Sequence, residues 1–293
     1  MKSSCKPGHR RQHVARAVDR ALRLLLVVSL FARWSSAQVG DGSYQRPLFT
    51  WRDAVLAGGF AMGTLAIRPL DKSAAVSLQR PYSQQQRLLR TTSAIVRTIA
   101  EPGSVIIGTS MYAVGRVSHS DRLAELGLRG TEALFVGEGF ANVLKYSFGR
   151  ARPFVDTVSP NPDDWQLLRG LHRGDRYRSF PSGHTVAAFA AAAAVSSETS
   201  RWWPQATYYG IGPALYAGAI AVGASRMYEN RHWASDVIMG AAIGTFAGTK
   251  VVRYSLTHPR NRIDRWLLHG SVPTSDLRHI TLSLSPLLSK PAR

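Results

Sequence analysis

The chain has 293 residues, of which 45% are hydrophobic, and it carries a formal net charge of +19. This length accommodates one large domain or two small ones. A charge this positive is typical of chains that bind nucleic acid or an anionic membrane surface. The single cysteine, Cys5, excludes a disulfide within the chain and a metal site built from several cysteines.

Residues 1–37 have the layout of a secretory signal peptide. A basic segment that ends at Arg23 precedes the apolar stretch 24–32, and the small residues Ser35 and Ala37 precede the expected cleavage point. The apolar stretch is too short to cross a bilayer, which needs about 20 residues. We therefore expect export to a bacterial periplasm or to the periplasmic side of the inner membrane; the alternative is an uncleaved membrane anchor.

Much of the positive charge lies in this leader. Residues 1–37 hold eight Lys or Arg and one Asp, so the remaining chain has a net charge of +12. The remaining sequence has no basic stripe interleaved with aromatic residues, so we expect no nucleic-acid partner. An anionic substrate or a membrane surface fits an exported basic protein better.

The segments that follow predict an all-α fold. Residues 38–50 are polar and predict a linker, residues 51–256 a helical domain, and residues 257–293 a C-terminal tail in which 280–288 could form one edge strand. The domain contains apolar segments of 12 to 18 residues that are rich in Ala and lack period-2 alternation, so helices explain them better than strands. These segments are 54–67, 104–115, 131–148, 185–197, 207–224 and 237–252.

We therefore expect a bundle of about six core helices with the functional residues at helix ends. The spacing of Gly240, Gly244 and Gly248 predicts close contact between helices. Charges interrupt most of the segments, and the mean hydropathy of −0.11 is low for a chain that mostly spans a membrane. The sequence leaves open whether the bundle is embedded in a membrane or associated with its surface.

The first cluster of polar residues, KYSFGRARP, follows the segment 131–148. Lys145 falls in the last helical turn, Gly149 allows the chain to turn away, and Arg152 precedes Pro153, which disfavours helical geometry. These basic groups would converge where the helix ends. The alternative is a solvated basic helix terminus that complements the helix dipole.

The second cluster, PSGHT, stands at the start of an alanine-rich helix. Helix N-termini expose unpaired amides that bind anions, and Pro181 would start this helix. Ser182 can cap the helix or contact an anion, Gly183 admits a ligand close to the backbone, and His184 lies in the first turn. The alternative is a capped structural helix with an incidental histidine.

The third cluster lies in residues 225–236. His232 and Asp236 are four residues apart and would share a helix face, so that Asp236 could accept a hydrogen bond from one imidazole nitrogen and leave the other free. A histidine held in this way serves as a nucleophile or base. Arg226 adds a guanidinium for an oxyanion. The alternative is a surface ion pair.

Together the clusters supply what a tetrahedral phosphate needs, namely positive donors for its oxygens and two histidines for attack and protonation. In order and spacing they resemble the type 2 phosphatidic acid phosphatase and vanadium haloperoxidase superfamily. The residues that carry this resemblance are Lys145, Arg152 and Pro153; Pro181, Ser182, Gly183 and His184; and Ser225, Arg226, His232 and Asp236.

The resemblance implies an all-α phosphohydrolase that needs no metal or other cofactor. It implies that His232 is the nucleophile that forms a phosphohistidine, that Asp236 orients it, and that His184 protonates the leaving group and then activates water. It also implies that the substrate phosphate is bound by Lys145, Arg152, Ser182, Gly183 and Arg226. Weaker candidates, as suited to packing as to chemistry, are Arg150, Tyr228, Asn230 and Trp233.

The expected substrate is a phosphomonoester or a lipid-linked phosphate or pyrophosphate, either a phosphorylated lipid or a small phosphoester. Two other activities could use the same residues. A vanadate-dependent haloperoxidase would hold vanadate with His232 as axial ligand, and a phosphotransferase would pass the phosphoryl group to an acceptor other than water. A basic envelope-binding module without activity is the non-enzymatic alternative.

Overall fold

A computed structural model describes residues 47–259 and 261–268. Over these residues the chain is all-α, as predicted, and contains no strand. The predicted signal peptide, most of the predicted linker and the predicted edge strand 280–288 lie outside the described residues. The helices are α2 (Trp51–Ile67), α3 (Asp71–Leu78), α4 (Pro81–Gln84), α5 (Arg87–Thr98), α6 (Ser104–Val117), α7 (Asp121–Phe148), α8 (Arg169–His172), α9 (Gly183–Trp202), α10 (Pro204–Ala206), α11 (Gly212–Tyr228), α12 (Ala234–Thr257) and α13 (Arg262–Leu267).

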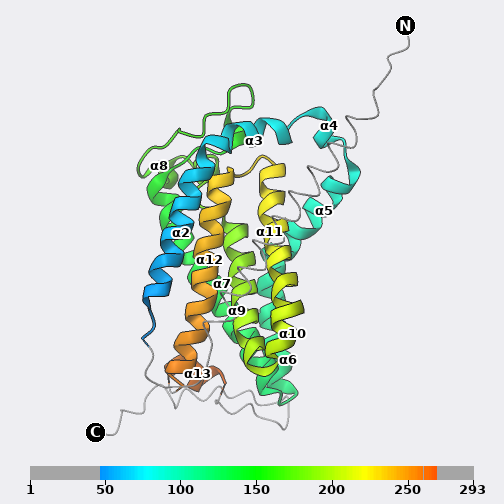
Figure 1. Ribbon diagram of the computed structural model, residues 1–293, viewed down its shortest axis with the longest axis vertical. Coiled ribbons are helices and arrows are strands. Elements are labelled where there is room, and N and C mark those ends of the chain that lie inside the picture. Colours follow the sequence, from blue (N-terminus) through cyan, green and yellow to red (C-terminus); the bar gives the residue numbers. More distant parts are fainter. Residues whose placement is uncertain (1–46, 260, 269–293) are drawn as a thin grey trace, which may run out of the picture.

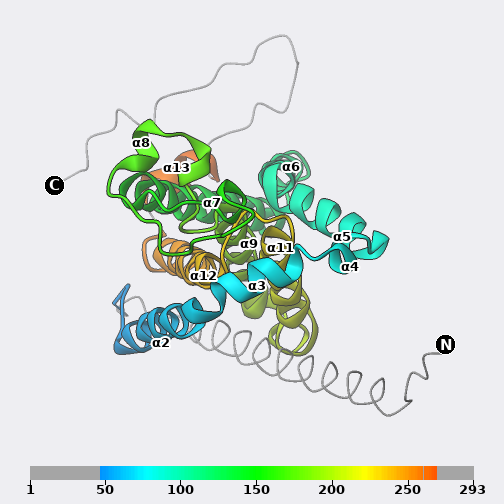
Figure 2. The same cartoon turned by 90° about the horizontal axis from the view of Figure 1, so that it is seen from above.

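The alanine-rich helix α9 forms the centre of the bundle. It packs against α12, α7 and α11, and the view along the bundle shows these three helices around it (Figure 2). Helix α2 covers the outer side of α12, and α6 lies along α7. Because alanine has a short side chain, α9 brings its backbone close to several neighbours at once.

Each predicted helical segment lies within a helix or a helix pair, but some boundaries differ. Helix α7 begins at Asp121 and has 28 residues, because the polar stretch before Thr131 continues the same helix. Helix α5 was not predicted, since it is amphipathic and mostly polar, yet it packs against α11. The short helix α13 likewise lies in a region that the sequence indicated only as a tail.

Glycines on α12 allow the close contact with α9 that their spacing predicts. A Cβ atom at Gly244 would lie 2.3 Å from the carbonyl oxygen of Val186, and one at Gly248 would lie 2.5 Å from the carbonyl oxygen of Ala190. A Cβ at Gly240 would lie 2.7 Å from the carbonyl oxygen of Ser182. The two backbones therefore approach so closely that no side chain fits between them.

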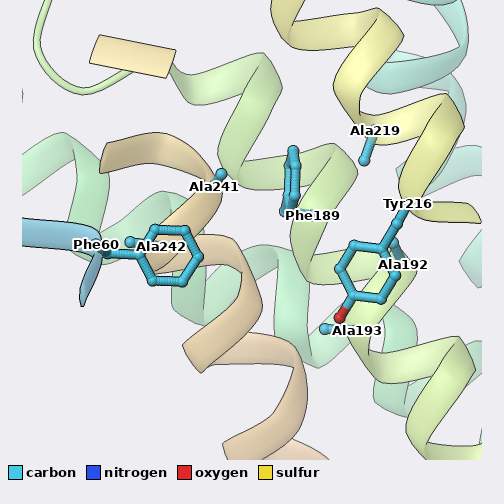
Figure 3. Packing of buried hydrophobic residues seen from close by; sticks show 8 residues of the cluster. All are labelled: Phe60, Phe189, Ala192, Ala193, Tyr216, Ala219, Ala241 and Ala242. Atoms are coloured by element: carbon cyan, nitrogen blue, oxygen red, sulfur yellow. The ribbon is translucent and has the colours of Figure 1, made fainter. Parts of the chain in front are cut away.

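Larger side chains fill the space between α9 and the outer helices. Phe189 of α9 packs edge to face on Tyr216 of α11, with ring centroids 5.9 Å apart, and Phe60 of α2 completes the same cluster (Figure 3). The remaining members are alanines. This cluster fixes α2, α11 and α12 around α9.

The outer face of the bundle is partly apolar. Phe135 and Phe140 of α7 have exposed fractions of 64% and 56%. In the part of the chain that the structure describes, the helices fall short of the length and apolar character needed to cross a membrane.

The packing of α12 on α9 predicts opposite effects for two glycine substitutions. Gly244→Ala should lower the free energy of unfolding by about 1–3 kcal/mol, because its methyl group would overlap the α9 backbone. Gly58→Ala in α2, where nothing lies within 4 Å, should raise it by up to about 1 kcal/mol, because alanine favours the helix. Urea unfolding of both variants checks this, and equal effects would contradict the packing argument.

Candidate active site

The three polar clusters of the sequence meet at one end of the bundle. There α7 and α11 end, α9 and α12 begin, and the loop between α7 and α9, which includes α8, lies over them (Figure 1). Gly149 lets the chain leave α7 in a left-handed conformation, with φ of 53°, and a Cβ atom there would lie 2.3 Å from the carbonyl oxygen of Gln166. The long loop can therefore fold back against the end of α7.

His232 lies between α11 and α12 and is held from both sides of its ring. Its Nδ1 atom is 2.6 Å from the carbonyl oxygen of Ser179, and its Nε2 atom is 3.2 Å from Nη1 of Arg152. The carbonyl can only accept a hydrogen bond and the guanidinium can only donate one. The proton therefore sits on Nδ1, and the lone pair of Nε2 accepts the hydrogen bond from Arg152.

The His232 side chain is also kept neutral. It is almost fully buried, and burial together with the positive charge of Arg152 lowers its pKa to about 3. A neutral imidazole, with the proton on one nitrogen held by a hydrogen bond, is the form that acts as a nucleophile.

Asp236 does not orient His232 in the way the spacing predicted. Its Oδ2 atom is 3.7 Å from Nδ1, too far for a hydrogen bond, and accepts instead from the Ser179 hydroxyl at 2.5 Å and from the Trp233 backbone at 2.9 Å. The carbonyl of Ser179 takes the place expected for the carboxylate. Asp236 therefore acts on His232 through Ser179, which contacts both residues, and through its charge.

A buried guanidinium explains why Asp236 faces away. Arg150 pairs with Asp236 through Nη1, donates from Nη2 to Asp71 at 2.8 Å, and stacks over the ring of Trp165 at 4.5 Å. Burial alone would raise the pKa of Asp236, but the charge of Arg150 and the hydrogen bonds to the carboxylate lower it to about 2. Arg150, a weaker candidate in the sequence, is thus a structural residue that joins α3 to the start of α12.

Two further weak candidates also have structural partners. Trp233 is fully buried and donates from its indole nitrogen to the carbonyl oxygen of Ala151 at 2.8 Å. The Tyr228 hydroxyl donates to the carbonyl oxygen of Ser83 at 3.2 Å. Asn230 has a left-handed backbone, with φ of 58°, in the turn after α11.

The two arginines predicted to bind phosphate are paired with carboxylates. Arg152 donates from Nε to the backbone oxygen of Asp175 at 2.8 Å and from Nη2 to its carboxylate at 2.5 Å. Arg226 donates from Nη1 to Glu229 at 2.6 Å, while its buried Nε has no hydrogen-bond partner among the described residues. Burial lowers the pKa of both arginines, yet groups whose ordinary pKa is 12.5 keep their charge at neutral pH.

Lys145 meets the PSGH segment at Gly183. A Cβ atom at Gly183 would lie 2.5 Å from the Lys145 Nζ atom, so the glycine makes room for the ammonium group at the start of α9. The same Nζ atom lies 3.6 Å from Glu138 Oε2, and burial raises the pKa of Glu138. The first and second clusters therefore form adjoining walls of one site.

The start of α9 differs in detail from the prediction. The helix begins at Gly183 with Ser182 as its N-cap, so Pro181 precedes the helix instead of starting it. Ser182 is fully buried; its hydroxyl accepts from Thr185 at 2.8 Å, and its backbone amide donates to the Asp236 carbonyl at 3.1 Å. Ser182 thus ties α9 to α12 beneath the site.

His184 is the more open of the two histidines, with 24% of its side chain exposed. Its Nδ1 atom lies 2.9 Å from Oε2 of Glu101, which comes from the segment η2 (Ile99–Gly103) between α5 and α6. Sequence reasoning missed Glu101, because it lies far along the chain from the three clusters. Ser179 could have been considered, since it lies beside the PSGH motif.

The comparisons with known proteins agree with the three motifs. Residues 128–260 match the model of the PAP2 superfamily, and this range contains all three motifs. The predicted resemblance is therefore confirmed over these residues, which make up a little under half of the chain.

Two similar proteins are phosphatases by name. The chain is 39% identical over 110 residues to the lipid A 1-phosphatase of Porphyromonas gingivalis, an alignment that covers 38% of this chain and only 19% of that protein. A solved structure, that of a transmembrane PAP2-type phosphatidylglycerolphosphate phosphatase from Bacillus subtilis, is 20% identical with a TM-score of 0.49, over 70% of this chain and 96% of that chain.

The lowered pKa of His232 makes a prediction about stability. In the unfolded chain this histidine takes up a proton as the pH falls below about 6.5, whereas in the folded protein it stays neutral down to about pH 3. The unfolded state therefore binds more protons in this window, and stability falls with pH. Wild-type protein should lose ~1 kcal/mol more per pH unit than His232→Gln between pH 6 and pH 4.

Urea unfolding of both proteins at pH 7, 6, 5 and 4 measures this difference. The other ionisable groups are common to both proteins and cancel from the comparison. Parallel stability curves would show that His232 is protonated as readily in the folded protein as in the unfolded chain.

Proposed function

We propose that the protein is a phosphohydrolase that works without a metal ion and removes phosphate through a phosphohistidine intermediate. The observation that carries the proposal is His232, a buried neutral histidine with Nδ1–H bound to a carbonyl and its Nε2 lone pair directed at Arg152. This arrangement keeps Nε2 unprotonated, and Nε2 would attack once a phosphate oxygen takes the Arg152 donor that now faces it.

The positive groups around Nε2 suit the phosphoryl group. Arg152 and Arg226 would bind phosphate oxygens, and within residues 47–259 and 261–268 no group competes for the Nε donor of Arg226. Lys145 would bind a further oxygen at the start of α9, beside Gly183. These charges stabilise the transition state, in which negative charge spreads over the oxygens.

The proposed reaction has two steps. In the first, His232 Nε2 forms a bond to phosphorus, the bond from phosphorus to the leaving oxygen breaks, and His184 donates a proton to that oxygen. In the second, His184 takes a proton from water, the water oxygen attacks phosphorus, and the bond from Nε2 to phosphorus breaks. Inorganic phosphate and the free histidine result.

We further propose that the substrate is a phosphorylated lipid at a membrane surface. The similar protein from Porphyromonas gingivalis is a lipid A phosphatase by name, and the exposed Phe135 and Phe140 of α7 provide an apolar surface for a lipid environment. The predicted leader adds that the protein is exported and acts at the periplasmic side of the inner membrane. The net charge of +12 outside the predicted leader suits an anionic lipid head group.

The proposed mechanism predicts phosphate release that EDTA does not abolish. His232→Ala should reduce this release by several orders of magnitude, because the nucleophile is lost. His258→Ala, at the opposite end of α12, is the matched control and should retain wild-type activity. Release of inorganic phosphate from phosphatidate, a prenyl pyrophosphate and a water-soluble phosphoester, with and without EDTA, measures these effects.

Two results would contradict the proposal. Loss of activity in EDTA would indicate a metal-dependent reaction, and full activity of His232→Ala would exclude His232 as the nucleophile. The three substrates also distinguish a lipid phosphatase from an enzyme for soluble phosphoesters.

A further inference from the structure

We infer that Glu101 is a positioning residue for His184, so that the site contains a carboxylate–histidine pair dedicated to the leaving group. This inference rests on the proposed phosphohydrolase function. It assigns a role to a residue that lies outside all three motifs and before residues 128–260, which match the PAP2 superfamily model.

Glu101 contacts His184 directly and holds one edge of its imidazole ring, at Nδ1. Glu101 Oε2 lies 2.9 Å from His184 Nδ1, within hydrogen-bond distance. An ionised carboxylate only accepts hydrogen bonds, so Nδ1 carries a proton whether or not the ring is charged. The proton that His184 exchanges with a substrate must therefore be the one on Nε2.

The backbone at Glu101 is suited to this contact. Between helical neighbours Glu101 has an extended conformation, with φ of −155° and ψ of 118°, which interrupts the path from α5 to α6. The following residue, Pro102, disfavours helical geometry at Glu101. The next residue, Gly103, packs so closely that a Cβ atom would lie 2.7 Å from the carbonyl oxygen of Thr98. This local break turns the segment η2 against α9, where His184 lies.

The charges around Glu101 keep it ionised. The hydrogen bond with His184 lowers the pKa of Glu101; burial opposes this, and the charges of His184, Lys145 and Arg226 lower the pKa further. Glu138, the other carboxylate facing this group, is paired with Lys145. Glu101 is thus a negative group beside His184 and within the field of the phosphate-binding cations.

The chemical consequence depends on the leaving group. An alkoxide, such as the alcohol part of a lipid phosphate, is a poor leaving group and departs only as it takes a proton, whereas a nitrophenolate departs without one. A carboxylate that orients the proton donor should therefore matter for an alkyl phosphate and matter little for an aryl phosphate. A residue that only stabilises the fold would affect both substrates alike.

The test compares Glu101→Gln with wild type on an alkyl phosphate and on 4-nitrophenyl phosphate. We use kcat/KM because it reports the steps up to departure of the leaving group. Glu101→Gln should lower kcat/KM about 10- to 100-fold for the alkyl phosphate and no more than about threefold for the aryl phosphate. Glu125→Gln, which removes a carboxylate beside Arg201 near the other end of α9, is the control and should change neither value.

A second variant tests whether Glu101 acts through His184. In a His184→Ala background, Glu101→Gln should cause little further loss on the alkyl phosphate, because the group that it positions is absent. Thermal unfolding of each variant verifies the fold; Glu101 is about half exposed (49%), so the glutamine substitution should leave it intact.

Four results would overturn the inference. Equal losses on the two substrates would indicate a general structural or electrostatic role, and no loss would show that Glu101 has no role in the reaction. An undiminished effect in the His184→Ala background would show that Glu101 acts independently of His184. Wild-type protein inactive on both substrates would contradict the proposed function itself, and with it this inference.

Discussion

The candidate active site of this protein depends on one buried ionic cluster, that of Arg150 with Asp71 and Asp236. All three side chains are fully buried, so removal of Arg150 would leave two uncompensated carboxylates in the interior, at a cost of about 3–5 kcal/mol. Ser235 adds hydrogen bonds from its backbone amide and hydroxyl to Asp71 at 2.9 and 2.5 Å. These contacts join α3, the loop after α7 and the first turn of α12 into one unit. Ser179 is attached to this unit because its hydroxyl donates to Asp236, and its carbonyl oxygen in turn holds His232.

The cations of the site are balanced by carboxylates from several parts of the chain. Arg152 faces Asp175, Arg226 faces Glu229, Lys145 faces Glu138, and the imidazole of His184 faces Glu101. The contact of His184 with Glu101 differs from the others because Glu101 lies in η2, where the helical path from α5 to α6 is interrupted. A concentration of like charges at one end of a bundle would be unfavourable without such partners, since burial weakens the hydration of each ion.

The sequence predicted the fold class well because the core helices are long, apolar and rich in small residues. It could not predict α5, whose mostly polar sequence becomes a packed helix only through its contact with α11.

At the site, the three motifs identified the groups that the structure brings together, because each motif stands next to a helix end. The spacing of His232 and Asp236 was misleading: His232 precedes the first residue of α12, Ala234, and Arg150 competes for the carboxylate. Glu101 could not be predicted, because only the packing of η2 against α9 places it beside His184.

The contact between Arg152 and Asp175 has a thermodynamic consequence for any anion that enters. Asp175 lies on the exposed loop and already occupies two donors of Arg152, through its backbone oxygen and its carboxylate. An anion that takes these donors must first displace Asp175, so its measured affinity is a difference between two ionic contacts. The loop thus works as an internal competitor. Under the proposed reaction it would weaken the binding of the phosphate product as much as that of the substrate phosphate, so tight binding would require further contacts with the rest of the substrate.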